Sequence, residues 1–104
     1  MNITDIRIRR MLTEGRLRAV VSITLDNVLA VHDIKVIEGP ERLFVAMPSR
    51  REENGTFRDV VHPISPEARQ YLESAILEAY QRELEIRAAE LEEASALSDV
   101  SEVE

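Results

Sequence analysis

The stretch Arg16-Leu17-Arg18-Ala19-Val20-Val21-Ser22-Ile23-Thr24-Leu25-Asp26 has the period of a β-strand. Every second residue from Leu17 to Leu25 is apolar, and the positions between them carry mostly polar or charged side chains. Successive side chains of a strand point to opposite faces, so this pattern predicts a half-buried strand with one face on an apolar core.

Four further segments are rich in Val, Ile, Thr or Phe, and short turn signals separate them from one another. The segments are residues 3–11, 28–37, 42–47 and 56–62, and the signals are Glu14-Gly15, Asp26-Asn27, Glu38-Gly39 and Asn54-Gly55. Asn-Gly between apolar runs is a strong hairpin signal. The first 64 residues are therefore expected to form an antiparallel meander of about five strands.

The period changes after Pro63. Ser65 can cap a helix, and Pro66 suits a first helical turn, where its missing N–H has no partner to lose. One apolar stripe at helical spacing follows: Ala68, Leu72, Ala75, Ile76, Ala79 and Tyr80. A C-terminal helix covering the sheet gives an α+β fold. Leu77, Leu84 and Leu91 are spaced by sevens, but two heptads are too few to identify a coiled coil.

Residues 28–37 carry apolar side chains at both alternating sets of positions. One helix cannot cover both faces of a sheet, so this segment predicts exposed apolar surface that a partner buries. A homodimer is the simplest expectation, and strand addition at an open sheet edge is one way to form it.

The net charge of −7 is unevenly distributed. Residues 1–72 carry eleven basic and ten acidic side chains, whereas residues 73–104 carry two basic and ten acidic ones. We expect a domain over residues 1–84, followed by an acidic helix extension and a disordered tail over residues 85–104. The longest apolar run has five residues and no secretory signal is visible, so a cytoplasmic protein without membrane contact is expected.

Residue types suited to catalysis are sparse. The chain has no cysteine, His32 and Asp33 are expected on opposite faces of a strand, and His62 precedes a proline. Each glycine belongs to a turn, so no glycine-rich phosphate loop is expected, and no paired metal-ligand spacing occurs. Adjacent loop carboxylates such as Glu52-Glu53 are usually solvated and not metal ligands. The sequence therefore predicts a protein that is not an enzyme, with no cofactor, metal or small-molecule substrate.

Arginines form two clusters. On the first hairpin, Arg7, Arg9, Arg16 and Arg18 are expected on one sheet face, with Arg9 opposite or next to Arg16 or Arg18, where an anion would relieve their repulsion. The alternative is an ordinary solvated face. On the Asn54-Gly55 hairpin, Arg50, Arg51 and Arg58 could reach phosphates, or they could simply pair with Glu52 and Glu53.

Several stretches in order resemble the SpoVG family, the stage V sporulation protein G or septation proteins of bacteria. They are SITLD at 22–26, VHDIKVIEG at 31–39, LFVAMPSRR at 43–51, FRD at 57–59 and HPI at 62–64. The similarity runs from about Ile3 to about Glu83. It implies a small α+β homodimer that binds DNA and RNA with site preference, regulates gene expression, and is linked to septation and sporulation.

The resemblance also implies site residues. The family's basic pair after Met-Pro-Ser corresponds to Arg50 and Arg51, and the helix from Pro66, which carries Arg69, is implicated as well. The full candidate nucleic-acid set is Arg50, Arg51, Arg58, Arg9, Arg18 and Arg69. Where many members have Thr-Pro-Asp-Gly, this chain has Glu52-Glu53-Asn54-Gly55, which adds negative charge beside the pair.

An alternative function is a protein-interaction adaptor acting through the acidic helix and the apolar strand surface. It predicts that function depends on Leu77, Leu84 and Leu91 and not on Arg50 and Arg51.

Overall fold

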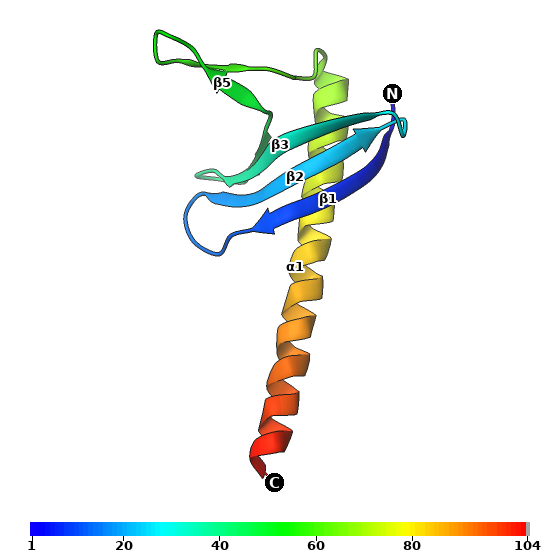
Figure 1. Ribbon diagram of the computed structural model, residues 1–104, viewed down its shortest axis with the longest axis vertical. Helices are drawn as coiled ribbons and strands as arrows, with labels where there is room; N and C mark the ends of the chain where they lie inside the picture. Colours follow the sequence, from blue (N-terminus) through cyan, green and yellow to red (C-terminus); the bar gives the residue numbers. More distant parts are fainter. Residues whose placement is uncertain (104) are drawn as a thin grey trace.

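A computed structural model describes the backbone of residues 1–103 and the side chains of residues 1–94. Six strands precede one helix: β1 (Ile3–Met11), β2 (Leu17–Leu25), β3 (Leu29–Glu38), β4 (Leu43–Ala46), β5 (Ser49–Arg51), β6 (Phe57–Asp59) and α1 (Pro66–Val103). The predicted α+β class is confirmed. Figure 1 shows α1 lying across one face of the sheet, with the other face uncovered.

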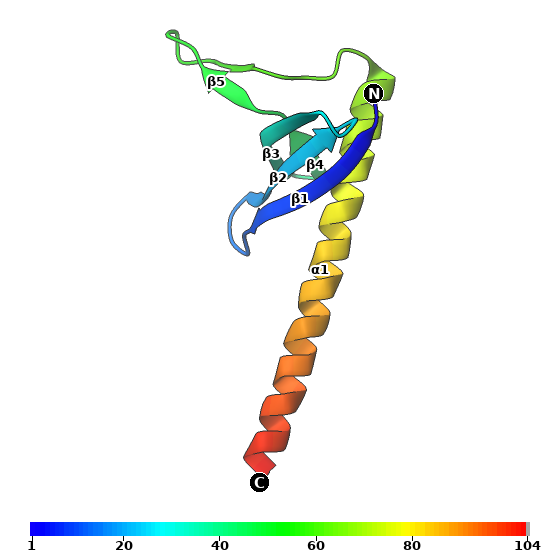
Figure 2. The same cartoon turned by 45° about the vertical axis from the view of Figure 1, so that its right-hand side comes forward.

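The main sheet has four antiparallel strands in the order β1-β2-β3-β4, so the prediction of five strands is wrong by one. The segment expected as the fifth strand contains β6, which pairs with β5 in a separate two-stranded ribbon. Met47 and Pro48 separate β4 from β5, and proline cannot donate to a strand ladder. The chain therefore leaves the sheet at this point, and the ribbon projects away from the body (Figures 1 and 2).

Two predicted turns have the expected backbone. Asp26 and Asn27 both have positive φ (50° and 58°), as a two-residue hairpin turn requires. In the ribbon turn, Gly55 has φ 88° and its N–H donates to the Glu52 carbonyl. Asn54 accepts hydrogen bonds from the N–H and hydroxyl of Thr56 and so fixes the exit of the turn.

A β-bulge in β3 corrects the prediction of a strand that is apolar on both faces. The register passes from Ile23↔Val31 to Val21↔Ile34, and Asp33 has φ 62° at the irregularity. The extra residue brings Val31 and Ile34 to the same face, where both are buried. The apolar residues of this segment that stay exposed are Val28, Leu29 and Ala30 at its start, while Ile37 near its end is half-buried.

Helix α1 begins as predicted. The Ser65 hydroxyl accepts from the Ala68 N–H at 3.1 Å, so Ser65 is the N-cap, and Pro66 follows in the first turn. The predicted stripe faces the sheet, with Ile76 and Tyr80 in the core. The complete core is Ala19, Val21, Ile23, Val31, Ile34, Val36, Val45, Met47, Ile76 and Tyr80.

Two polar contacts tie α1 to opposite edges of the sheet. The Tyr71 hydroxyl accepts from the Ile3 N–H of β1 at 2.9 Å, and the Glu73 carboxylate accepts from the Val45 N–H of β4 at 3.2 Å. Each contact occupies a donor on an edge strand. The helix therefore both covers the core and partly blocks the two edges against further strand pairing.

The helix continues well past the sheet (Figure 1) and reaches Val103. It thus includes the segment expected as an extension and the segment expected as a disordered tail, and most of that tail lies outside the residues whose side chains are described. A domain boundary at residue 84 stays a prediction. No helix in the described part of the chain is long and apolar enough to cross a membrane.

Candidate nucleic-acid interface

The β5–β6 ribbon carries the basic pair that the sequence singled out. Its pairs are Ser49↔Asp59, Arg50↔Arg58 and Arg51↔Phe57, and all six residues are exposed. Alternation along a strand places Arg50 and Arg58 on one face of the ribbon and Arg51 with Phe57 on the other. A narrow projecting ribbon of this kind therefore presents cations on both of its faces.

One of the three ribbon arginines is already occupied. Arg58 Nε lies 3.0 Å from Glu52 Oε1. For this arginine, the alternative that Glu52 and Glu53 simply pair with the cluster is therefore correct. Within the described residues, Arg50 and Arg51 form no ion pair. The two arginines of the family's basic pair are thus the ribbon cations available to an anionic ligand.

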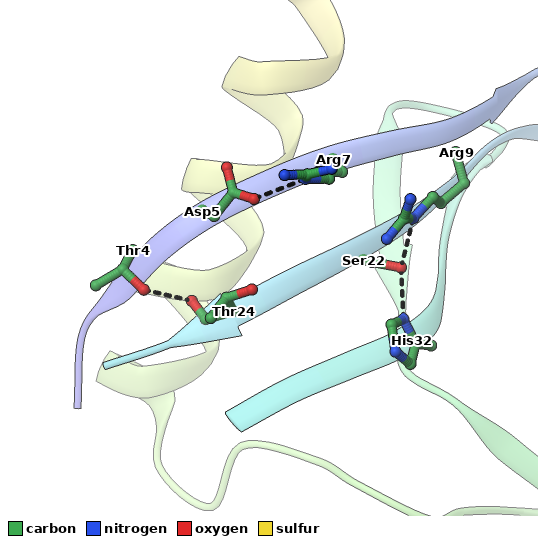
Figure 3. Close-up of polar contacts among 7 residues, drawn as sticks. All are labelled: Thr4, Asp5, Arg7, Arg9, Ser22, Thr24 and His32. Atoms are coloured by element: carbon green, nitrogen blue, oxygen red, sulfur yellow. Dashed lines mark hydrogen bonds and ion pairs between the residues drawn. The ribbon is translucent and has the colours of Figure 1, made fainter. Parts of the chain in front are cut away.

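Arg9 belongs to a second polar site, on the sheet face away from α1. Its Nε donates to the Ser22 hydroxyl at 3.3 Å, and Ser22 Oγ lies 2.8 Å from His32 Nδ1. Figure 3 shows these three side chains in one row across β1, β2 and β3. Ser22 is 6% exposed, so the row anchors Arg9 on a buried hydroxyl.

The predicted juxtaposition of Arg9 with Arg16 or Arg18 is wrong. A bulge between Ile8 and Arg10 puts Arg9 beside Ser22 instead. Arg18 donates to the Glu38 carboxylate and to the Thr13 carbonyl, which closes the end of the first hairpin. Arg18 is therefore a structural residue in this fold and contributes little free charge.

The outer sheet face carries two further cations, Arg10 and Lys35, that the strand pattern did not identify as site residues. Arg10 is paired with Val20, and Val20 is paired with Lys35, so both basic residues share the face opposite the core. Within the described chain neither forms an ion pair, whereas Arg7 on the same face pairs with Asp5 at 2.9 Å. Alternation in residues 34–37 is enough to predict that Lys35 lies on the outer face. The face of Arg10 cannot be predicted in this way, because it depends on the bulge at Arg9.

Arg69 lies in the first turns of α1, on a different element from the ribbon, and its charge acts on Glu73. Burial by itself raises the pKa of Glu73. This effect is outweighed by interactions that favour the carboxylate, so the pKa lies below its ordinary value of 4.5. They are the hydrogen bond from Val45, the hydrogen bond and charge of Arg42, and the charge of Arg69. Glu73 is therefore an ionised anchor between α1 and β4.

No three His, Asp or Glu side chains in the described residues lie close enough to hold a metal ion. His62 is exposed, and its Nδ1 lies 3.0 Å from the Pro63 carbonyl oxygen. What the ribbon and the outer sheet face offer is exposed positive charge on a rigid antiparallel frame.

The family model for SpoVG matches residues 1–82, which include the whole sheet, the ribbon and the start of α1. The chain belongs to the SpoVG family. Proteins named "Putative septation protein SpoVG" are similar throughout this region. The chain is 56% identical to the one from Desulforudis audaxviator over 81 residues, covering 78% of this chain and 92% of the relative.

Two other SpoVG relatives have similar levels of identity to this chain. The protein of the same name from Clostridioides difficile is 56% identical over 84 residues, covering 81% of this chain and 91% of the relative. The one from Bacillus cytotoxicus is 52% identical over 96 residues, covering 92% of this chain and 99% of the relative. The resemblance stated from the sequence is confirmed, and the SpoVG family model ends near the point where α1 leaves the sheet.

Proposed function

We propose that this SpoVG-family protein is a regulator that binds DNA and RNA through the β5–β6 ribbon. The observation that carries the proposal is the pair Arg50 and Arg51 on an exposed, projecting two-stranded ribbon, with no ion pair to either one in the described residues. The major groove of B-DNA, about 12 Å wide, admits a two-stranded ribbon. Arginine suits the phosphates that flank it because its planar fork can bind two oxygens at once.

Backbone contacts are expected to dominate this binding. The chain has 4% aromatic residues and no tryptophan, so it offers few stacking platforms for unpaired bases. Arg10 and Lys35 on the outer sheet face would supply further phosphate contacts. Affinity should therefore depend strongly on salt, and site preference should come from the few arginine contacts that reach base edges.

We further propose that the working form is a homodimer. From β6 onward the chain exposes apolar side chains in close succession: Phe57 in β6 is 71% exposed, and Val60 and Ile64 after it are 64% and 90% exposed. Val60 and Ile64 lie in the arm between the ribbon and α1, and a second copy would bury them together with Phe57. Two ribbons in one dimer would contact nucleic acid at a fixed spacing.

The cellular role that goes with this binding is regulation of septation, sporulation and gene expression, by similarity to the SpoVG relatives. A cytoplasmic, non-enzymatic protein is consistent with this role. No cofactor takes part in the proposed binding.

The test compares Arg50→Ala/Arg51→Ala with wild type by fluorescence anisotropy on labelled duplex DNA and on RNA. The matched control is Arg82→Ala/Arg87→Ala, which removes the same charge from the acidic helix. The ribbon variant should bind at least about tenfold more weakly, equivalent to about 1.4 kcal/mol, while the control binds as wild type. Equal affinities for wild type and the ribbon variant would overturn the proposal.

A further inference from the structure

A groove lies between the first hairpin and the part of α1 that has left the sheet. Met11, Leu12 and Thr13 form one wall, and Leu84, Ala88 and Leu91 contribute the apolar part of the other. Its volume is about 550 Å³. In Figures 1 and 2 β1 ends at the level where α1 begins to project beyond the sheet.

The helix wall of this groove carries an exposed apolar stripe, flanked by Arg87 and Glu90. Leu84 is 38% exposed and Leu91 is 72% exposed, one heptad apart and on the same side of α1 as Ala88. Apolar side chains at this spacing present a stripe to which the apolar face of another helix can pack. The groove therefore has the form of a helix-docking site.

Charge on the helix wall selects the kind of helix that fits. Residues 83–94 contain five glutamates and a single basic residue, Arg87. Arg87 Nε is already 2.9 Å from Glu83 Oε1 in the preceding turn. Glu90 lines the groove, and helical spacing places Glu85 and Glu92 along the other side of the stripe. None of these three forms an ion pair among the described residues, so a positively charged occupant is favoured.

The same charges argue against other occupants. A second copy of this helix would bring glutamates against glutamates, which is repulsive at close range. A nucleic-acid backbone or an anionic lipid surface would be repelled for the same reason. None of the residues that line the groove belongs to the β5–β6 ribbon, so the two surfaces are separate.

We infer that this groove binds a basic amphipathic helix of a partner protein, with apolar residues of the partner on Leu84 and Leu91 and its lysines or arginines on the surrounding glutamates. The inference does not depend on the proposed nucleic-acid function, because it uses none of the ribbon or sheet-face arginines. It gives the molecule two separate surfaces of opposite charge preference.

The probe is a fluorescein-labelled Leu/Lys peptide of about five helical turns, roughly 18 residues, with its leucines at heptad spacing. The full chain should bind it with a micromolar Kd. Two comparison peptides separate the contributions of pattern and charge: a scrambled Leu/Lys peptide without an apolar stripe, and a Leu/Glu peptide with the same stripe. Both should bind at least about tenfold more weakly than the Leu/Lys probe.

The groove variant is Leu84→Ser/Leu91→Ser, and the matched control is Ile86→Ser, which alters an exposed apolar residue of the same helix that does not line the groove. The groove variant should lose at least about tenfold in affinity, and the control should stay within about twofold. Circular dichroism checks that both remain folded. Equal binding by wild type and groove variant, or equal binding of the scrambled peptide, overturns the inference.

A second copy as the occupant is the remaining outcome to test. Light scattering on wild type and the groove variant decides this directly. Loss of a dimer in the Leu84→Ser/Leu91→Ser protein, with no affinity of wild type for the Leu/Lys peptide, would overturn the inference and assign the groove to self-association. An unchanged mass together with peptide binding supports it.

Discussion

Arg50 of β5 lies directly opposite Arg58 of β6, on the same face of the ribbon. Cross-strand neighbours have their Cβ atoms about 5 Å apart, so the two positive charges repel each other and destabilise the ribbon. The carboxylate of Glu52 partly offsets this repulsion through its ion pair with Arg58. A phosphate placed between the two arginines would relieve the repulsion. The ribbon is thus held in a charge arrangement that favours an anionic ligand.

Glu52→Gln should raise affinity for nucleic acid, because it frees Arg58 from its ion pair. We expect a gain of about threefold at low salt, in line with the strength of an exposed pair. Glu53→Gln is the matched control, since it removes the same charge from the adjacent residue, for which the structure shows no ion pair in the described chain. Anisotropy titrations that give equal gains for both variants would contradict the role assigned to the Glu52–Arg58 pair.

Glu73→Gln should destabilise the protein at pH 7 by about 1–2 kcal/mol, because it removes the charged acceptor shared by Val45 and Arg42. The folded pKa of Glu73 is below its ordinary value of 4.5, so its contribution is present above pH 4.5 and is lost as the pH falls through the lower folded pKa. Urea unfolding of both proteins at pH 7 and near pH 3 checks this.

The difference between wild type and Glu73→Gln should shrink at the lower pH. Glu78→Gln is the control for that comparison, since Glu78 is exposed and its one ion pair among the described residues is with Arg82, one turn away. It should change the free energy of unfolding by less than about 0.5 kcal/mol. A Glu73→Gln effect that is independent of pH would show that packing, and not the carboxylate charge, explains the loss.

Ile76→Ala should cost about 2–5 kcal/mol, because Ile76 is fully buried between α1 and the sheet and its truncation leaves a cavity. Ile86→Ala, on the projecting part of the same helix, should cost less than about 1 kcal/mol. Denaturant unfolding at one protein concentration gives both values. Similar costs at the two positions would mean that the projecting helix is buried in solution.

Asp33→Val should destabilise the protein by about 1–2 kcal/mol or more, because a β-branched residue disfavours the positive φ of the β3 bulge. Asp33→Gly adopts that backbone without strain and should stay within about 1 kcal/mol of wild type. Thermal unfolding separates the two variants. Tolerance of valine at this position would indicate that the bulge is absent and that β3 has the two-sided register expected from simple alternation.

Local signals explain which parts of the fold the sequence predicted. Alternation from Leu17 to Leu25, the Asp26-Asn27 and Asn54-Gly55 turns, and the Ser65 cap act within a few residues, so β2, both turns and the start of α1 followed from them. The bulge at Asp33 has no such local signal, because aspartate tolerates positive φ only as one of several conformations. The bulge nevertheless decides which face of the sheet receives Val31.

Tertiary context explains the rest. Strands β5 and β6 form a sheet of their own. Their separation depends on Pro48 and on where the chain must turn back to α1. Alternation along the sequence specifies neither. The ribbon arginines were predictable because they lie beside a clear hairpin turn. Lys35 and Arg10 were not singled out, and their shared face depends on strand register and on the bulge beside Arg10.

The salt dependence of nucleic-acid binding tests the central claim most directly. Wild type and Arg50→Ala/Arg51→Ala are titrated against labelled duplex DNA over a series of salt concentrations, after light scattering confirms the same mass for both. If two arginines per protomer contact phosphates in a dimer, the log–log slope should become shallower by up to about 3.6, at about 0.9 per contact. An unchanged slope would contradict binding through the ribbon.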